Sequence, residues 1–293
     1  MPAASPLHVR KISVGYWRAT FDNPPINLFD SPVFAALRML IDEVERDDHV
    51  RIVVFDSADP AYFVSHLDVD GPDDVPEVPG SARLVDDWHH FVARLARAPI
   101  VSIASIRGRA RGMGAEFALA CDMRFASRET GVLAVPQLGL GVVPGGGSMD
   151  WLPHLVGRPR ALEIMLGGQD FDSDTAERYG WVNRALPDDK LDAFVEELAT
   201  RVAGFDRRAI ATTKRMINER SALPTEKGLQ QSFSAFLEAC TWPEAKVRLA
   251  AMRAKGWGRD TEVELHYSHH VGQLASEILH SERAPKHPDG ETR

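Results

Sequence analysis

The stretch from Ala98 to Asp122 constrains the fold more than any other, because a buried strand, a glycine turn and a helix follow one another there. The strand is indicated by an apolar, partly β-branched run: Ile100, Val101, Ile103 and Ile106. Gly108, Gly112 and Gly114 allow positive φ or close backbone approach. Glu116 stands in the first turn of the helix. Free N–H groups at a helix start suit a developing oxyanion, so the adjacent carboxylate is a candidate for proton transfer.

The glycines do not fit the commoner phosphate-binding or nucleophile motifs. The run that begins at Gly112 has Phe117 where a dinucleotide fingerprint needs its third glycine, and the run that begins at Gly139 has Pro144 there. No G-x-x-x-x-G-K-[ST] sequence occurs, which disfavours a P-loop. Asp150 occupies the final glycine position of a nucleophile elbow.

Four blocks resemble the crotonase superfamily, the enoyl-CoA hydratase and isomerase group, in order and spacing. They are NPPINL (23–28), DPAYFVSHLD (59–68), RGRARGMGAEFALACD (107–122) and PQLGLGVVPGGG (136–147). The resemblance implies an α/β fold, a spiral of ββα units with a helical C-terminal trimerisation region. It also implies an acyl-CoA thioester as substrate, a homotrimer or a dimer of trimers, and no metal or cofactor apart from the coenzyme A of the substrate.

The chemistry that the resemblance implies passes through a thioester enolate. Carried over by position, the backbone N–H groups of Leu67 and Met113 form the oxyanion hole. The same blocks place five residues at the substrate: Ser65, His66, Asp68, Gly112 and Gly114. Ser65 and His66 replace the Ala-Gly of the family loop. His66 is expected to be an ordinary loop histidine, with contact to pantetheine or a part in proton transfer as the alternatives.

Two positions carry the acid–base chemistry of a typical hydratase. Here the first is Glu116, but the second is Gln137, whose amide can orient water and cannot act as a general base. Ordinary hydration is therefore less favoured. Asp68, Asp122 and Asp150 are possible substitute acids.

Three functions remain open. The first is an acyl-CoA enzyme of the hydratase or isomerase type with Glu116 as acid and base. The second is an acyl-CoA hydrolase or C–C lyase on the same fold. The third is a catalytically silent acyl-CoA-binding protein.

Bulk composition excludes several other classes of protein. The chain has 293 residues, with 44% hydrophobic and 26% charged side chains, as in an ordinary globular protein. A net charge of −8 argues against a nucleic-acid partner. Two cysteines, no apolar segment of signal-peptide length and no run that could cross a bilayer favour a cytoplasmic protein without disulfides. Cys121 is expected to be a buried structural thiol.

The alternation of strand and helix signals divides the chain into three parts. Residues 1–205 form the ββα core, 206–260 a helical oligomerisation region, and 261–293 a helical extension with a polar tail. Strands are expected at 12–21 and 50–55, and a helix capped by Ser31 with Pro32 in its first turn. The acidic, proline-containing segment 68–80 is expected to be a surface loop.

Basic residues near the glycine turn have two possible roles. Arg107, Arg109 and Arg111 would share one side of an extended backbone and face pantetheine or phosphates. Alternatively they form a solvated edge or pair with the acidic loop. Lys214 is assigned no role beyond surface charge.

The aromatic side chains available for burial between subunits include Phe233, Phe236 and Trp242, together with Leu237.

Overall fold

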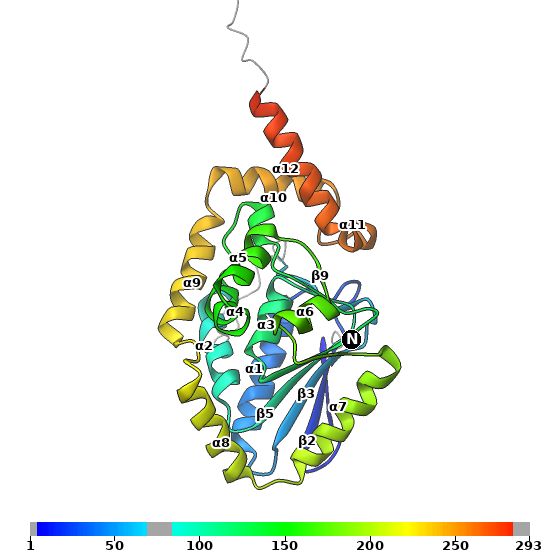
Figure 1. Cartoon of the computed structure of the whole chain (residues 1–293), viewed down its shortest axis with the longest axis vertical. Coiled ribbons are helices and arrows are strands. Elements are labelled where there is room, and N and C mark those ends of the chain that lie inside the picture. The colour runs from blue at the N-terminus through cyan, green and yellow to red at the C-terminus, as the bar shows by residue number, and fades with distance from the viewer. Residues whose placement is uncertain (1–4, 69–83, 284–293) are drawn as a thin grey trace, which may run out of the picture.

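The fold was obtained as a computed structural model that describes residues 5–68 and 84–283, and its strands form two sheets (Figure 1). The larger sheet has the order β1-β2-β3-β5-β7-β10 and the smaller β4-β6-β8-β9. The larger sheet contains β1 Leu7–Lys11, β2 Tyr16–Phe21, β3 Ile52–Ser57, β5 Val101–Ile106, β7 Met123–Ser127 and β10 Arg184–Leu186. The smaller sheet contains β4 Tyr62–Val64, β6 Arg109–Arg111, β8 Val132–Ala134 and β9 Phe171–Asp172.

The chain builds these sheets by alternating between them. Strand β3 belongs to the larger sheet and β4 to the smaller, and the pairs β5–β6 and β7–β8 repeat this step. Neighbouring strands from β2 to β10 in the larger sheet are parallel. The pairs lead in turn to α2 (Leu84–Arg97), to α3 (Met113–Ala120) and, through the short 3-10 helix η1 (Gln137–Leu140), to α4 (Ser148–Val156). This is the spiral of ββα units that the resemblance implied.

Helices cover both faces of the larger sheet (Figure 1). Because side chains alternate along a strand, Ile52 and Val54 face one side and Val53 and Phe55 the other. Helix α7 (Asp188–Ala203) packs on the first side through apolar residues at helical spacing: Leu191, Val195, Ala199 and Val202. Helices α1 (Ser31–Arg46), α2 and α3 cover the second side and form most of the core.

Two local expectations from the sequence are wrong. The strand expected at 12–21 is present only from residue 16, as β2, because residues 12–15 form the turn that connects it to the antiparallel strand β1. The N-cap of α1 is Asp30 and not Ser31, because the Asp30 carboxylate accepts a hydrogen bond from the N–H of Val33 at 2.8 Å. Pro32 lies in the first turn, as expected.

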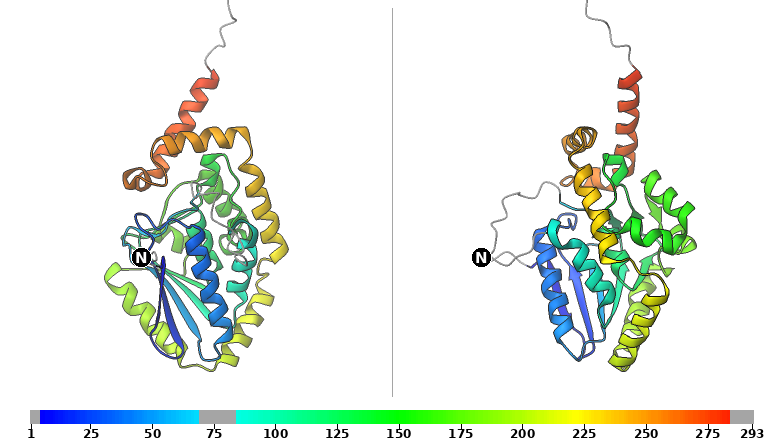
Figure 2. Two further views of the ribbon diagram at one scale, coloured as in Figure 1. Left: turned by 180° about the vertical axis from the view of Figure 1, so that it is seen from behind. Right: turned by 90° about the vertical axis from the view of Figure 1, so that its left-hand side faces the viewer.

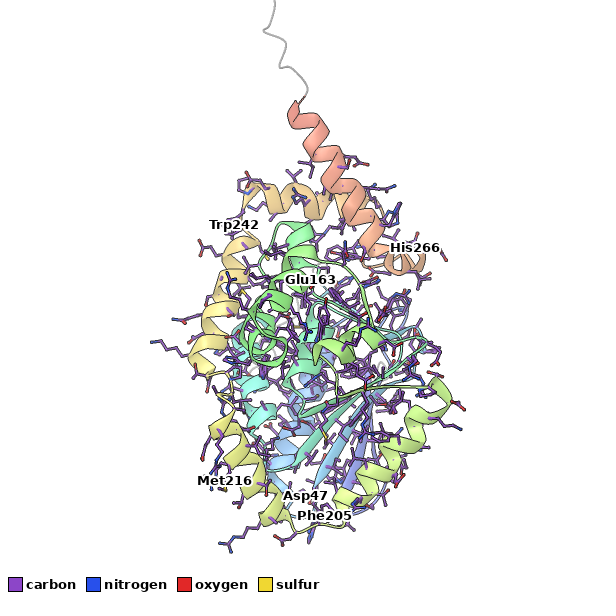
Figure 3. All side chains as sticks on the ribbon, viewed as in Figure 1. Asp47, Glu163, Phe205, Met216, Trp242 and His266 are labelled. Carbon is purple, nitrogen blue, oxygen red and sulfur yellow. The ribbon has the colours of Figure 1, made fainter. Side chains whose placement is uncertain are left out.

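Beyond Leu186 the described residues contain helices and no further strand. These are α8 (Arg207–Arg220), α9 (Glu226–Ala239), α10 (Pro243–Ala254), α11 (Thr261–Leu265) and α12 (Tyr267–Arg283). Figure 2 shows the distal part of α12 extending away from the body of the molecule. Phe233 is buried in the core of its own chain, whereas Trp242 and Met216 lie on the outer surface (Figure 3). Phe233 is thus not available for burial between subunits.

The remaining helices, α5 (Arg158–Gly167) and α6 (Ser173–Tyr179), follow α4 in the chain. Across the described residues, every helix is too short or too polar to cross a membrane. Two expected segments, the acidic loop beyond residue 68 and the polar tail from 284, lie outside the described residues.

Close backbone contact at Gly114 fixes the position of α3, the helix that carries Glu116. A Cβ atom at Gly114 would lie 2.0 Å from the carbonyl oxygen of Val64, at the end of β4. The ring of Phe117, one helical turn later, packs edge-on against Phe55 with 5.0 Å between centroids. Gly114 lets α3 approach β4 closely, and the ring of Phe117 packs α3 against the larger sheet.

We predict that Gly114→Ala lowers the free energy of unfolding by more than about 2 kcal/mol, because the new methyl group meets a backbone atom that cannot move alone. Gly167→Ala is the matched control, since its Cβ would meet nothing within 4 Å. The control is expected to change stability by less than about 1 kcal/mol. Urea denaturation of the three proteins measures both effects, and equal stabilities would contradict the close approach.

Candidate active site

The turn from β6 into α3 places the start of a helix at a cavity. Gly112 adopts φ +49°, which glycine tolerates best, and its N–H donates to the Ala134 carbonyl at 3.0 Å. Met113 then begins the helix. The N–H of a first helical residue has no partner within its helix, so it is free to serve a ligand. Both Gly112 and Met113 line the cavity.

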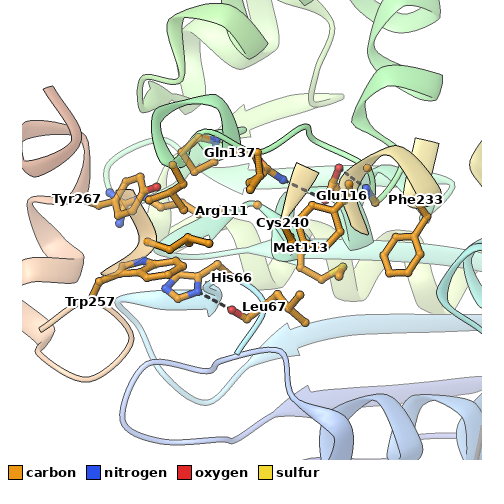
Figure 4. Close-up of a pocket in the computed structure, with 18 residues that line it drawn as sticks. His66, Leu67, Arg111, Met113, Glu116, Gln137, Phe233, Cys240, Trp257 and Tyr267 are labelled. Atoms are coloured by element: carbon orange, nitrogen blue, oxygen red, sulfur yellow. Dashed lines mark hydrogen bonds between the residues drawn. The ribbon is translucent and has the colours of Figure 1, made fainter. Parts of the chain in front are cut away.

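A second N–H group meets the first from the loop after β4. Residues 66–68 run beside Phe29, whose N–H donates to the His66 carbonyl at 2.8 Å and whose carbonyl accepts from Asp68 at 3.0 Å. In such a parallel bridge the N–H of the middle residue, Leu67, points away from the partner. Leu67 lines the same cavity as Met113 (Figure 4). The structure thus brings together the two positions that the sequence assigned to an oxyanion hole.

The carboxylate of Glu116 lies in the same cavity and is buried. Its Oε1 accepts hydrogen bonds from the N–H groups of Gly146 at 2.8 Å and Ser148 at 3.2 Å. Its Oε2 accepts from Nε2 of Gln137 at 3.2 Å (Figure 4). Burial raises the pKa of Glu116 to about 7, although the two N–H donors oppose the rise. A carboxyl group with this pKa can both accept and donate a proton near neutral pH.

The loop that supplies donors to Glu116 is held by Trp88, a residue that no sequence signal tied to this site. The indole Nε1 of Trp88, on α2, donates to the Gly146 carbonyl at 2.9 Å. A Cβ atom at Gly146 would lie 2.3 Å from Oε2 of Glu116, so the loop approaches the carboxylate only because this residue is glycine. The glycine run was the one available sequence signal, and it did not reveal Trp88.

Gln137 occupies the position facing Glu116 that the resemblance assigned to a second acid. It begins η1 and lines the cavity. Its Oε1 is buried and has no hydrogen-bond partner among the described residues. The amide therefore donates to Glu116 and keeps an acceptor for a further donor, but it supplies no second base.

His66 is not the ordinary loop histidine that the sequence suggested. It is buried, lines the cavity, and stacks on Trp257 with 4.5 Å between ring centroids. Its Nε2 lies 3.0 Å from Oε1 of Glu264 and its Nδ1 lies 2.9 Å from the Leu67 carbonyl oxygen. Glu264, Trp257 and Tyr267 come from the C-terminal segment, and no sequence signal tied them to this site.

The three arginines do not share one side as expected. Gly108, with φ +65°, lies between the first two and breaks the alternation of an extended backbone. Arg107 pairs with Asp188 and Asp192 on α7. Arg111 is buried at the cavity wall, where it pairs with Asp170 rather than facing solvent.

Several other candidates lie beside the cavity and not in its wall. The described lining residues do not include Ser65, Asp68 or Gly114. Nor do they include Asp150, whose pKa is raised by burial. Asp122 accepts hydrogen bonds from the backbone and side chain of Ser102 and pairs with the Lys214 ammonium at 2.8 Å, so both charged groups have structural roles. Lys214 was wrongly reduced to surface charge.

The remainder of the wall is apolar and suits a hydrocarbon group. Most of it comes from η1, the segment after it and the C-terminal helices: Leu140, Val142, Phe233, Phe236 and Leu249. Cys121, by contrast, is buried in the core, where burial raises the pKa of its thiol. Within residues 5–68 and 84–283, no three His, Cys, Asp or Glu side chains gather as ligands for a metal ion.

The ββα spiral thus carries one cavity that is lined by the buried Glu116 and by Leu67 and Met113. The chain matches the enoyl-CoA hydratase/isomerase family over residues 12–251, and it therefore belongs to that family.

Individual relatives agree with this assignment. A probable enoyl-CoA hydratase of Mycobacterium bovis is 34% identical over 78% of this chain and 84% of its own length. The short-chain-enoyl-CoA hydratase of Clostridium acetobutylicum is 26% identical over 78% and 87%. The crystal structure of a candidate enoyl-CoA hydratase from Streptomyces avermitilis is 39% identical, with a TM-score of 0.85 over 93% of this chain and 99% of that one.

We predict that the pH dependence of stability reveals the buried acid. The pKa of Glu116 is about 7 in the folded chain and returns toward 4.5 on unfolding, so the folded state binds the extra proton between these values. Rising pH therefore removes stability from the wild type and not from Glu116→Gln. The stability of the variant relative to the wild type should increase from pH 4.5 to 8, by up to about 3 kcal/mol. Urea denaturation at both pH values measures this, and a constant difference would contradict the raised pKa.

Proposed function

We propose that this protein acts on an acyl-CoA thioester and moves a proton between carbon atoms of the acyl group through an enolate. Of the described residues that line the cavity, Glu116 alone carries a carboxylate. It shares the cavity with the N–H groups of Leu67 and Met113, and this arrangement carries the proposal. Coenzyme A enters as part of the substrate, and the proposal requires no separate cofactor.

In the proposed reaction Glu116 acts first as base and then as acid. Its carboxylate removes a proton from the α-carbon of a 3-enoyl thioester, and the electron pair moves onto the thioester oxygen. The N–H groups of Leu67 and Met113 stabilise the negative charge; loss of one such donor in other enzymes costs about 3–4 kcal/mol. Glu116 then returns its proton to the γ-carbon, which leaves the double bond conjugated with the thioester. Its pKa of about 7 suits both steps.

Gln137 favours this proton transfer over hydration by a pair of carboxylates. Hydration needs a base that activates water, and an amide can hold water without accepting its proton. Gln137 instead donates to Glu116 at 3.2 Å. The apolar wall formed by Leu140, Val142 and Phe233 suits the hydrocarbon part of the acyl group.

We also propose a homotrimer, or a dimer of such trimers, that uses the helices of residues 206–255. Several large apolar side chains of this region are exposed in the single chain: Met216, Ile217, Leu237, Trp242 and Val247. Large exposed apolar side chains are candidates for burial against another subunit. Light scattering gives the number of subunits, and a stable monomer at micromolar concentration would exclude the assembly.

The proposed reaction is tested with short 3-enoyl-CoA and 2-enoyl-CoA substrates. Isomerisation of the first raises the ultraviolet absorbance of the conjugated thioester, whereas hydration of the second lowers it. Isomerisation faster than hydration would support the proposal. Release of free coenzyme A would identify a hydrolase instead, and tight binding without turnover of either substrate would identify a silent acyl-CoA-binding protein.

We predict that Glu116→Gln lowers kcat by at least about 100-fold and leaves acyl-CoA affinity within a few-fold. A general acid or base contributes about 10² to 10⁴ in rate, and the amide has nearly the same shape as the carboxylic acid. Asp150→Asn is the matched control, because Asp150 carries a nearby half-buried carboxylate outside the cavity wall. Its kcat should stay within about threefold of wild type. Near-normal turnover by Glu116→Gln would show that Glu116 has only a structural role.

We predict that Gln137→Glu creates or raises hydration of crotonyl-CoA. The new carboxylate would lie beside Oε2 of Glu116, since the amide nitrogen now lies 3.2 Å from it. Two carboxylates so close raise the pKa of at least one of them, so one remains protonated while the other activates water. Gln137→Leu is the control and should show no gain. A folded variant that binds acyl-CoA and shows no gain would mean that residue 137 does not face the reacting carbons.

A further inference from the structure

Two departures from the family pattern meet at the oxyanion loop. His66 stands where the resembled family carries glycine, and Glu264 lies beyond residues 12–251, the part of the chain that matches the family. The structure places Nε2 of His66 3.0 Å from Oε1 of Glu264. Glu264 is fully buried and His66 is nearly so. The contact therefore joins a residue that departs from the family pattern to one outside the matched range.

The ring of His66 is held on three sides. Its Nδ1 lies 2.9 Å from the Leu67 carbonyl, which can only accept, so this nitrogen carries hydrogen. Its Nε2 faces the carboxylate of Glu264. Burial alone would raise the pKa of Glu264, but the contacts with His66 and Gly258 and the charge of Arg111 hold it below its ordinary value. The ring face stacks on Trp257, so both nitrogens and one face of the imidazole contact the protein.

Glu264 is itself anchored on both sides. Its Oε1 accepts from the N–H of Gly258 at 2.7 Å. Its main-chain carbonyl accepts from Nη1 of Arg111, whose guanidinium pairs with Asp170 through Nε at 2.9 Å and through Nη2. The guanidinium of Arg111 thus links the backbone of Glu264 to the carboxylate of Asp170. The Glu264 side chain is left to contact His66 and Gly258.

These contacts converge on the two peptide groups that flank Leu67. The carbonyl of the preceding peptide group accepts from Phe29, which directs the N–H of Leu67 into the cavity. The carbonyl of the following peptide group accepts from His66. The side chain of His66 therefore holds the carbonyl of Leu67, an atom to which Phe29 makes no hydrogen bond.

We propose that His66 and Glu264 are positioning residues that hold the N–H of Leu67 in place for the thioester oxygen. The C-terminal segment thereby supports an oxyanion hole whose two N–H donors belong to the family core. The inference rests on the proposed function, because it assigns Leu67 as an oxyanion donor. A misplacement of about 1 Å in such a group can cost 100-fold in rate.

The test compares Glu264→Gln with Glu262→Gln, an exposed residue on the same helix. Glu264→Gln removes the negative charge and keeps the shape of the side chain. We expect kcat to fall by about tenfold or more with KM within about threefold, because the contact acts when charge develops on the oxygen. Glu262→Gln should match the wild type in both constants. A rise in KM with unchanged kcat would overturn the proposal in favour of a direct binding contact, and unchanged constants would overturn it outright.

A double variant tests whether His66 and Glu264 act together. His66→Gly, which restores the family residue, should lower kcat as Glu264→Gln does, and the two changes combined should cost little more than either alone. Additive losses would mean that the residues act separately and would overturn the proposal. If Glu264→Gln does not fold, His66→Gly is used as the test variant instead, because glycine removes the whole imidazole and leaves no ring without a partner.

A measurement without turnover separates this inference from the proposed function. Amide hydrogen exchange at residues 65–68 should be faster in Glu264→Gln than in Glu262→Gln, because the loop loses an anchor. Equal exchange would overturn the positioning role whatever the enzyme does. Conversely, faster exchange in a protein whose wild type turns over neither enoyl-CoA would leave the loop contact standing and reject the proposed reaction. In the active enzyme, the near-ultraviolet enolate band of bound acetoacetyl-CoA should weaken in Glu264→Gln.

Discussion

The buried carboxylate of Glu116 is the constraint on which the site depends. A carboxylate removed from water needs donors, and here they come from Gly146, Ser148 and Gln137. Because all three hydrogen bonds end on Glu116, this one side chain holds the glycine loop, the start of α4 and the start of η1 around the first turn of α3. The indole of Trp88 then fixes the loop from behind. The donors do not cancel the effect of burial, and the pKa near 7 is the result.

The opposite wall of the cavity comes from a different part of the chain. The C-terminal helices form an apolar cluster with η1, through Leu140 and Val142 on one side and Met252, Trp257 and Tyr267 on the other. This packing carries Glu264 to His66. Glu116 and the loop at Leu67 are therefore supported by different parts of the chain. The residues of the family match carry Glu116, and the C-terminal segment shapes the surroundings of the loop.

The sequence predicted the ββα core well, because its signals are local. The apolar run before Gly108 forms β5, and the residues around Glu116 form α3. A side chain at Gly114 would collide with the backbone of Val64, so this position needs glycine. Prediction failed where two local signals compete. Asp30 and Ser31 are both good caps, and only the backbone geometry selects Asp30. The turn at residues 12–15 was hidden within a continuous strand-like run.

The sequence by itself determined the family and indicated that Glu116, Gln137, Leu67 and Met113 share one site, since these positions are carried by fixed spacings along one strand–turn–helix motif and its companion blocks. Only the tertiary structure decided the partners of these groups. Trp88 and Glu264 reach the site from distant segments, and no periodicity or spacing encodes a contact between side chains nearly 200 residues apart, as His66 and Glu264 are. Such contacts follow from how the helices pack, and packing depends on the whole chain.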